Sequence, residues 1–413
     1  MNSLPFSALL LDDTAAIPLR RASDLGAAIL VCLDLNDPGY EESAAEAVRL
    51  AQSAGALRTR IVGGKRARPD PKFFAGSGKV EEIGREADAL DAATVIFNHN
   101  LSAGQQRNLE KELGRKVLDR TELILRIFAQ RARTSEGKLQ VELAQLQHLA
   151  TRLVRGWTHL ERQRGGLGKT GGPGEKQIEL DRRYIAARVR ILKEKLVALK
   201  KQRTIRRRAR SRREVFSVTL VGYTNAGKST LFNALTHPSA GAYVADKLFA
   251  TLDTTTRKVW IAGGDPAGAG LQVVVADTVG FIRDLPHGLV AAFRATLEET
   301  LRADLLLHVV DSSSPGRTRE AEDVNKVLAE IGAEAIPQLA VWNKIDSSGL
   351  QEGVERDEYG RISRVLVSAK TGAGLAGLRG AIAEAAGPQK QAAGWPPSPE
   401  LSLPSNLSSE PSF

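Results

Sequence analysis

Apolar residues in the first third of the chain recur in short runs separated by helical patterns. Runs at Ile29 to Leu33, Leu57 to Val62 and Thr94 to Phe97 predict three strands. The stretches between them are rich in helix-forming residues. Strands that alternate with helices predict a small α/β domain with a parallel sheet over residues 25–134, after a flexible segment 1–24.

Residues 135–214 follow a different pattern, in which apolar residues lie alternately three and four positions apart. One stripe runs from Leu139 to Leu160 and a second from Ile185 to Leu199. The glycine-rich segment Gly165 to Glu175 lies between them. Two heptad stripes around such a segment predict an antiparallel helical hairpin with a flexible tip.

The tip of the predicted hairpin combines glycines with basic side chains. Glycines let a backbone approach a phosphodiester strand closely, and basic side chains neutralise its charge. A plain linker is the alternative. The candidate RNA-binding residues are Arg164, Gly165, Gly166, Lys169, Gly171, Gly172, Gly174, Arg182 and Arg183. A basic run from Lys200 to Arg213 follows, and it is either a solvated helix end or a further contact to RNA.

Alternating strands and helices return over residues 215–387, and a Pro- and Ser-rich segment 388–413 is expected to be disordered. The apolar run Val218 to Val221 predicts a buried strand, and the sequence GYTNAGKS follows it from Gly222 to Ser229. The pattern G-x-x-x-x-G-K-S between a strand and a helix is that of a phosphate-binding loop.

The chemistry of this loop explains its residue types. Glycines allow main-chain N–H groups to curl around phosphate oxygens. Lys228 adds a positive charge for the β- and γ-phosphates, and the Ser229 hydroxyl can bind Mg²⁺. The start of the helix at Thr230 adds a field that favours anions.

Three further polar motifs each follow a predicted strand. They read D-x-x-G at Asp277 to Gly280, N-K-x-D at Asn343 to Asp346, and S-A-K at Ser368 to Lys370. In an open α/β sheet, ligands bind at the carboxyl ends of the strands. We therefore expect a mostly parallel sheet with helices on both faces and one ligand site at this edge.

These motifs, with the FATLD segment at Phe249 to Asp253, resemble in order those of a small regulatory GTPase. Asp277 can hold Mg²⁺ through water, and the Gly280 N–H can meet the γ-phosphate. Asp346 can accept two hydrogen bonds from guanine, which adenine cannot donate. The expected nucleotide-binding residues are Gly222, Tyr223, Thr224, Asn225, Ala226, Gly227, Lys228, Ser229, Thr230, Phe249, Ala250, Thr251, Leu252, Asp253, Asp277, Thr278, Val279, Gly280, Asn343, Lys344, Ile345, Asp346, Ser368, Ala369 and Lys370.

The same motifs, with FFAGSGK, DRTELILRIFAQRA, EGKLQVELAQL and GPGE upstream, resemble the HflX family of ribosome-associated GTPases. The resemblance implies that Thr251 joins Ser229 on Mg²⁺, and that Lys228, Thr251 and Gly280 act in hydrolysis. It also implies binding to the large ribosomal subunit and its RNA, and splitting of stalled or stressed ribosomes. ATP-linked activity in the N-terminal domain is a further implication of the family alone.

Phe281 stands where many GTPases carry the glutamine that orients the attacking water. We therefore expect slow intrinsic GTP hydrolysis that a partner accelerates by ordering the switch segments. The glycine-rich turn Phe73 to Lys79 (FFAGSGK) lacks the full spacing of a phosphate loop. It is either a second phosphate site or an ordinary turn between strand and helix.

The net charge and the cysteine content limit the classes of binding partner and the cellular location that we expect. The net charge of +10 favours a polyanion, with nucleic acid as the first candidate and an anionic membrane surface as the second. The single cysteine, Cys32, excludes an internal disulfide and indicates a cytoplasmic protein, here expected to be a monomer. Two alternatives to a ribosome-splitting GTPase stay open, namely a nucleotide-regulated RNA chaperone and a GTPase peripheral at the membrane.

Overall fold

The computed structural model describes residues 25–155, 173–208, 215–236, 248–249, 251–252, 254–261, 271–283 and 299–387. The chain divides into two compact units. The first consists of Met1–Arg213 with Ala245–Asp253 and Ile282–Thr296, and the second of Glu214–Val244, Thr254–Phe281 and Leu297–Phe413.

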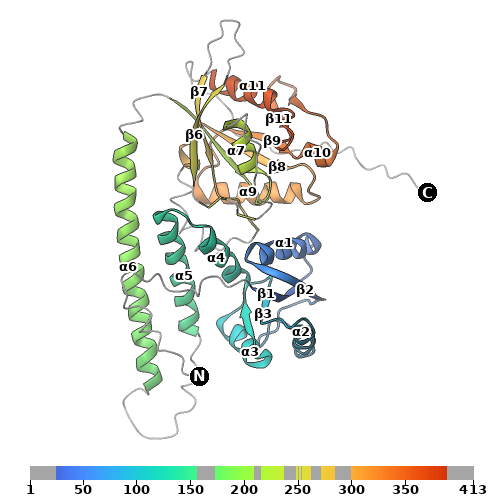
Figure 1. The fold of residues 1–413 in the computed structure, drawn as a ribbon, viewed down its shortest axis with the longest axis vertical. Helices are drawn as coiled ribbons and strands as arrows, with labels where there is room; N and C mark the ends of the chain where they lie inside the picture. Colours follow the sequence, from blue (N-terminus) through green and yellow to red (C-terminus); the bar gives the residue numbers. More distant parts are fainter. Residues whose placement is uncertain are drawn as a thin grey trace, which may run out of the picture. The chain divides into compact units, whose positions relative to one another are not determined.

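The first unit contains a four-stranded parallel sheet in the order β2-β1-β3-β4 (Figure 1). The strands are β1 (Gly26–Asp34), β2 (Ala56–Lys65), β3 (Thr94–Phe97) and β4 (Lys116–Leu118). The three strands predicted from the sequence are confirmed. The fourth was not expected, because three residues with an exposed Lys116 are too short to show an apolar pattern.

Helices cover both faces of this sheet. They are α1 (Tyr40–Ser53), α2 (Ser77–Leu90), α3 (Ala103–Leu113) and α4 (Arg120–Arg131). Side chains of α2 and α3 share a core with Ile29 and Val31, whereas α1 packs against Cys32. The alternation of β1 side chains between the two faces therefore builds two layers of helix around one sheet.

A helical hairpin follows α4 in the first unit. It consists of α5 (Ser135–Arg155) and α6 (Pro173–Arg208). Leu146 and Leu192 are buried in its seam, and Arg188 binds Glu142 across it at 2.8 Å. The predicted tip lies mostly outside the described residues, but α6 already begins at Pro173. A proline suits the first turn of a helix, where its missing N–H costs no hydrogen bond.

The second unit is built on a seven-stranded sheet in the order β10-β11-β9-β8-β5-β7-β6 (Figure 1). The strands are β5 (Phe216–Gly222), β6 (Thr255–Ile261), β7 (Leu271–Asp277), β8 (Leu305–Asp311), β9 (Gln338–Asn343), β10 (Gly353–Arg356) and β11 (Ile362–Leu366). The five inner strands are parallel, and the edge strands β10 and β6 are antiparallel to their neighbours. The expected mostly parallel sheet is confirmed.

Helices again lie on both faces. They are α7 (Lys228–Thr236), the short 3₁₀ helix η3 (Thr300–Arg302), α9 (Arg317–Ile331), α10 (Ile345–Ser348) and α11 (Leu375–Ala386). Side chains of α7 and α11 share one core with Leu220 and Leu307, while α9 packs against β5 and β8 from the other face (Figure 1). Among the helices described here, none is long and apolar enough to cross a membrane.

Candidate functional site

The loop between β5 and α7 has a backbone that only glycine can adopt at two positions. Gly222 has φ +149° and Gly227 has φ +91°. A Cβ on Gly222 would overlap the carbonyl oxygen of Val309, and one on Gly227 would overlap the side-chain amide of Asn343. The glycines of the motif are therefore required both by conformation and by close packing.

Lys228 lies at the first position of α7 and is almost fully buried. Its ammonium group donates to the carbonyl oxygens of Gly222 at 3.0 Å and Tyr223 at 2.8 Å. Burial lowers the pKa of Lys228 to about 8, and the nearby Asp277 carboxylate acts in the opposite direction. Because both bonded carbonyls are uncharged, the lysine remains able to attract phosphate.

Ser229 and Asp277 meet beside this lysine. The Ser229 hydroxyl donates to the Asp277 carboxylate at 2.7 Å, and Asp277 is 2% exposed. A hydroxyl and a carboxylate are hard oxygen ligands, which Mg²⁺ prefers. The residues present therefore fit a Mg²⁺ ion bound beside the phosphate loop.

The D-x-x-G segment closes against the phosphate loop through the main chain. Phe281 N–H donates to Gly222 O at 3.1 Å, and Thr224 N–H donates to Phe281 O at 2.7 Å. A Cβ on Gly280 would lie 2.8 Å from Thr224 Cα and 3.0 Å from the Lys228 ammonium, so this position also requires glycine. The Phe281 ring is buried at 1% exposure, which shows how an apolar residue fills the place of the glutamine.

The base-recognition motifs are tied to the phosphate loop by Asn343. Its side chain donates to Ala226 O at 2.9 Å and accepts from the Ala369 N–H at 2.9 Å. The Ser368 hydroxyl donates to Asp346 at 2.6 Å, which fixes the carboxylate expected to read guanine. One buried amide thus joins three motifs, because Asn343 contacts one residue 117 positions away in the sequence and another 26 positions away.

Other expected site residues are placed elsewhere or fall outside the described part. Phe249 belongs to the first unit, where its ring packs edge-on against Phe128 with centroids 4.7 Å apart. Thr251 belongs to the same segment of that unit. Ala250, Asp253 and the tip residues 164–172 lie outside the described residues, whereas Arg182 and Arg183 are exposed on α6.

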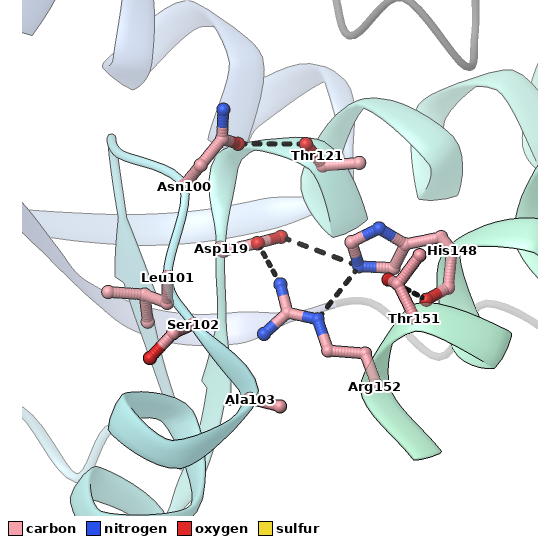
Figure 2. Close-up of a pocket in the computed structure, with 9 residues that line it drawn as sticks. All are labelled: Asn100, Leu101, Ser102, Ala103, Asp119, Thr121, His148, Thr151 and Arg152. Atoms are coloured by element: carbon pink, nitrogen blue, oxygen red, sulfur yellow. Dashed lines mark hydrogen bonds and ion pairs between the residues drawn. The ribbon is translucent and has the colours of Figure 1, made fainter. Parts of the chain in front are cut away.

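Sequence reasoning did not find a polar cavity of about 470 Å³ in the first unit, shown in Figure 2. The loop after β3, the start of α4 and one side of α5 line it, with Asp119, His148 and Arg152 at its centre. Asp119 was detectable as the cap of α4, since its side chain accepts from the Glu122 N–H at 2.8 Å.

The charges around this cavity balance one another. Arg152 forms an ion pair with Asp119, donates to Gln106 at 2.6 Å and donates to His148 at 3.3 Å. Burial lowers the pKa of His148, which favours its neutral form. Arg152 and His148 of α5 thus contact Asp119, the cap of α4, and Gln106 of α3, so the cluster fastens α5 to the α/β layer.

The turn FFAGSGK differs from the phosphate loop in what its lysine binds. Lys79 donates to Gly63 O at 2.8 Å and forms an ion pair with Glu82 at 2.8 Å. Its charge is therefore already neutralised by a neighbouring carboxylate. This arrangement favours the ordinary turn over a second phosphate site.

Comparison with known proteins covers most of the chain. Residues 41–129 match a family model described as "GTP-binding GTPase N-terminal", and residues 131–210 match "GTP-binding GTPase Middle Region". Residues 217–344 match "50S ribosome-binding GTPase". A GTP-binding protein of the archaeon Sulfolobus solfataricus, solved with GDP, is 25% identical with a TM-score of 0.44, over 88% of this chain and 98% of that chain.

Two relatives share about half of their residues with this chain. GTPase HflX of Escherichia coli (strain K12) is 51% identical over 86% of this chain and 82% of its own length. GTPase HflX of Magnetococcus marinus is 53% identical over 77% and 71% of the two chains. Identity at this level and coverage, together with the phosphate loop described above, shows that the chain belongs to the HflX family and is a GTP-hydrolysing enzyme.

Proposed function

We propose that this chain couples guanine nucleotide binding to contact with RNA of the large ribosomal subunit, and that it splits stalled or stressed ribosomes. The observation that carries the nucleotide half is the Asn343 amide, which bridges Ala226 and Ala369 at 2.9 Å each. It joins the phosphate loop to the base motifs, so triphosphate and guanine are bound by one connected set of residues.

Within this site, Lys228 and the loop amides bind phosphates, and Asp346 accepts hydrogen bonds from the guanine ring. Ser229 would hold Mg²⁺, with Asp277 acting through water, and the family resemblance assigns Thr251 as a further ligand. When bound, the ion would neutralise charge on the phosphate oxygens. Because Phe281 supplies no group to orient water, hydrolysis is slow until the ribosome orders the switch segments.

The ribosomal half of the proposal is supported by the hairpin and by the family model. Arg182 and Arg183 are exposed on α6, close in sequence to the glycine-rich tip. The chain matches a model described as a 50S ribosome-binding GTPase. Basic side chains on a helical hairpin suit an RNA backbone, because phosphate contacts supply most of the affinity for nucleic acid.

The test is co-sedimentation with separated ribosomal subunits, followed by sucrose-gradient analysis of intact ribosomes. With a non-hydrolysable GTP analogue, we expect binding to the large subunit and dissociation of ribosomes. With GDP or no nucleotide, we expect neither. Equal dissociation in every nucleotide state would instead support a nucleotide-regulated RNA chaperone.

A deletion in the hairpin tip tests whether ribosome dissociation can be lost while nucleotide binding is kept. Removing residues 165–174 is expected to abolish ribosome dissociation and to leave GDP affinity unchanged. Continued splitting by the deletion variant would remove the tip from the mechanism. Pelleting with anionic liposomes in the presence of GTP, with no effect on ribosomes, would support the membrane-surface alternative.

A further inference from the structure

Lys344 occupies a strained position in the base-recognition loop. It has φ +65° and ψ +35°, a left-handed conformation that few residues other than glycine adopt. The residues on either side, Asn343 and Ile345, are buried. Because the backbone is fixed on both sides, the direction of the Lys344 side chain depends on what binds its far end.

Asp311 binds that end. The Lys344 ammonium lies 2.7 Å from the Asp311 carboxylate, and the two side chains are 29% and 16% exposed. The other Asp311 oxygen accepts from the Ser313 N–H at 3.0 Å and from the Ser313 hydroxyl at 2.6 Å. One oxygen of the Asp311 carboxylate is therefore fixed by Ser313, while the other binds the Lys344 ammonium.

The backbone of Asp311 is fixed just as firmly. It ends β8 and pairs in register with Asn343 at the end of β9. The next residue, Ser312, donates its N–H to Asn343 O at 2.9 Å. Asp311 at the end of β8 and Lys344 just after β9 therefore lie at the same edge of the sheet.

The Lys344 stem passes the phosphate loop on its way to Asp311. A Cβ on Gly227 would lie 4.0 Å from Lys344 Cε. The end of the Lys344 stem therefore lies beside the loop that binds phosphate, next to the carboxylate that holds the ammonium. An aliphatic stem held at both ends presents an apolar surface, which suits the face of a purine ring.

We propose that Asp311 is a positioning residue for guanine nucleotides and acts through Lys344. By fixing the ammonium, it keeps the lysine stem in place as one wall of the base pocket. The contact is the same before and during hydrolysis, so its loss weakens binding without changing the chemical step. This inference rests on the proposed guanine site.

The main test is Asp311→Asn, measured by calorimetry with GDP and by GTP hydrolysis. We expect a roughly tenfold loss of affinity, a matching rise in KM and an unchanged kcat. Inosine and guanine nucleotides should weaken by the same factor, because the stem contacts the ring face rather than the 2-amino group. Affinity within twofold of the unsubstituted protein would overturn the proposal.

A double-mutant cycle shows whether Asp311 acts through the lysine. On a Lys344→Met background, Asp311→Asn is expected to cause no further loss. A second full tenfold loss would overturn the assignment. Ser313→Ala removes one of the two hydrogen bonds that Ser313 donates to Asp311 and keeps the carboxylate. If Asp311→Asn does not fold, a roughly twofold loss of GDP affinity in Ser313→Ala supports the proposal, and an unchanged affinity overturns it.

Glu384→Gln is the matched control. It breaks the exposed two-bonded ion pair with Arg356 in the same unit, at 2.9 and 2.8 Å, and should leave GDP affinity unchanged. If the unsubstituted protein fails to prefer guanine over adenine nucleotides, the proposed site itself is wrong. If it does prefer guanine and Asp311→Asn is silent, only the role of Asp311 is wrong.

Discussion

The two units carry the same dipeptide, Gly-Lys, at the beginning of a helix, but the two lysines have different partners. Gly227-Lys228 places a left-handed glycine before α7 and directs the lysine to two uncharged carbonyls. Gly78-Lys79 lies inside α2, and its lysine is paired with Glu82. A phosphate site thus depends on what the lysine already binds, and a short motif encodes that only in part.

The same contrast holds for the acidic groups at the two sheet edges. In the first unit, Asp119 is saturated by Arg152 and by the cap of α4. In the second unit, Asp346 is oriented by the Ser368 hydroxyl, a neutral donor. One carboxylate stabilises the fold, and the other is available to a ligand.

The largest expected effect comes from exchanging the two glycines for alanine. Gly227→Ala combines positive φ with overlap at Asn343, and we expect guanine nucleotide affinity to fall by more than about 3 kcal/mol. Gly78→Ala meets nothing within 4 Å in its helix and should stabilise the first unit by up to about 1 kcal/mol. Fluorescent GDP titration and thermal unfolding measure both. Equal effects of the two substitutions would contradict the difference that we infer between the phosphate loop and the start of α2.

Exchanging the two aspartates for asparagine is expected to act on different properties. Asp346→Asn should shift preference from guanine toward xanthine by about 1–3 kcal/mol, because an amide both donates and accepts. Asp119→Asn should leave base preference unchanged and destabilise the first unit by about 2–3 kcal/mol through loss of a buried ion pair. Competition between GDP and XDP, with denaturant unfolding, checks both. A change of base preference in Asp119→Asn would contradict the comparison.

A rise in pH is expected to change the stability of the two units in opposite directions. Burial, with Asp119 nearby, raises the pKa of Glu122 to about 7, so between pH 4.5 and 7 the native state holds a proton that the unfolded chain lacks. Its contribution to stability therefore falls as pH rises. Burial lowers the pKa of His308 to about 4, so between pH 4 and 6.5 the unfolded chain binds the extra proton and stability rises with pH.

We expect each group to change the stability of its own unit by up to about 3 kcal/mol across its window. Hydrogen exchange of amides in β4 and β8 follows the two units separately. Glu122→Gln should flatten the pH dependence of the first unit, and His308→Leu that of the second. Parallel slopes in both units would show that other groups dominate.

The smallest expected effect tests whether the first unit has a phosphate site at all. Lys79→Met removes a half-exposed ion pair and should change stability by no more than about 0.5 kcal/mol. Neither GDP affinity nor any ATP binding should change. Loss of ATP binding with GDP affinity intact would restore the turn FFAGSGK as a second phosphate site.

The nucleotide motifs could be predicted from the sequence because each requires a backbone that few residues permit. Gly222 and Gly227 adopt positive φ, and the motif records that requirement directly. The strands were predictable for a similar reason, since Leu220 and Leu307 belong to continuous apolar runs. Local chemistry and local pattern were sufficient in both cases.

The contacts that hold the motifs together could not be predicted, because they join residues distant in sequence. Asn343 reaches Ala226, and Asp311 reaches Lys344, only once β8 and β9 lie side by side. The cluster of Asp119 and Arg152 likewise depends on how α5 packs. The short strand β4 escaped notice because three residues carry too little pattern.

The link between Phe281 and the phosphate loop has one more consequence. Both of its hydrogen bonds use peptide groups, which every residue except proline possesses in full. These two hydrogen bonds therefore do not depend on which side chain occupies position 281. Packing alone selects the buried ring, so the position can exchange a polar water-orienting group for an apolar one while the D-x-x-G segment stays attached.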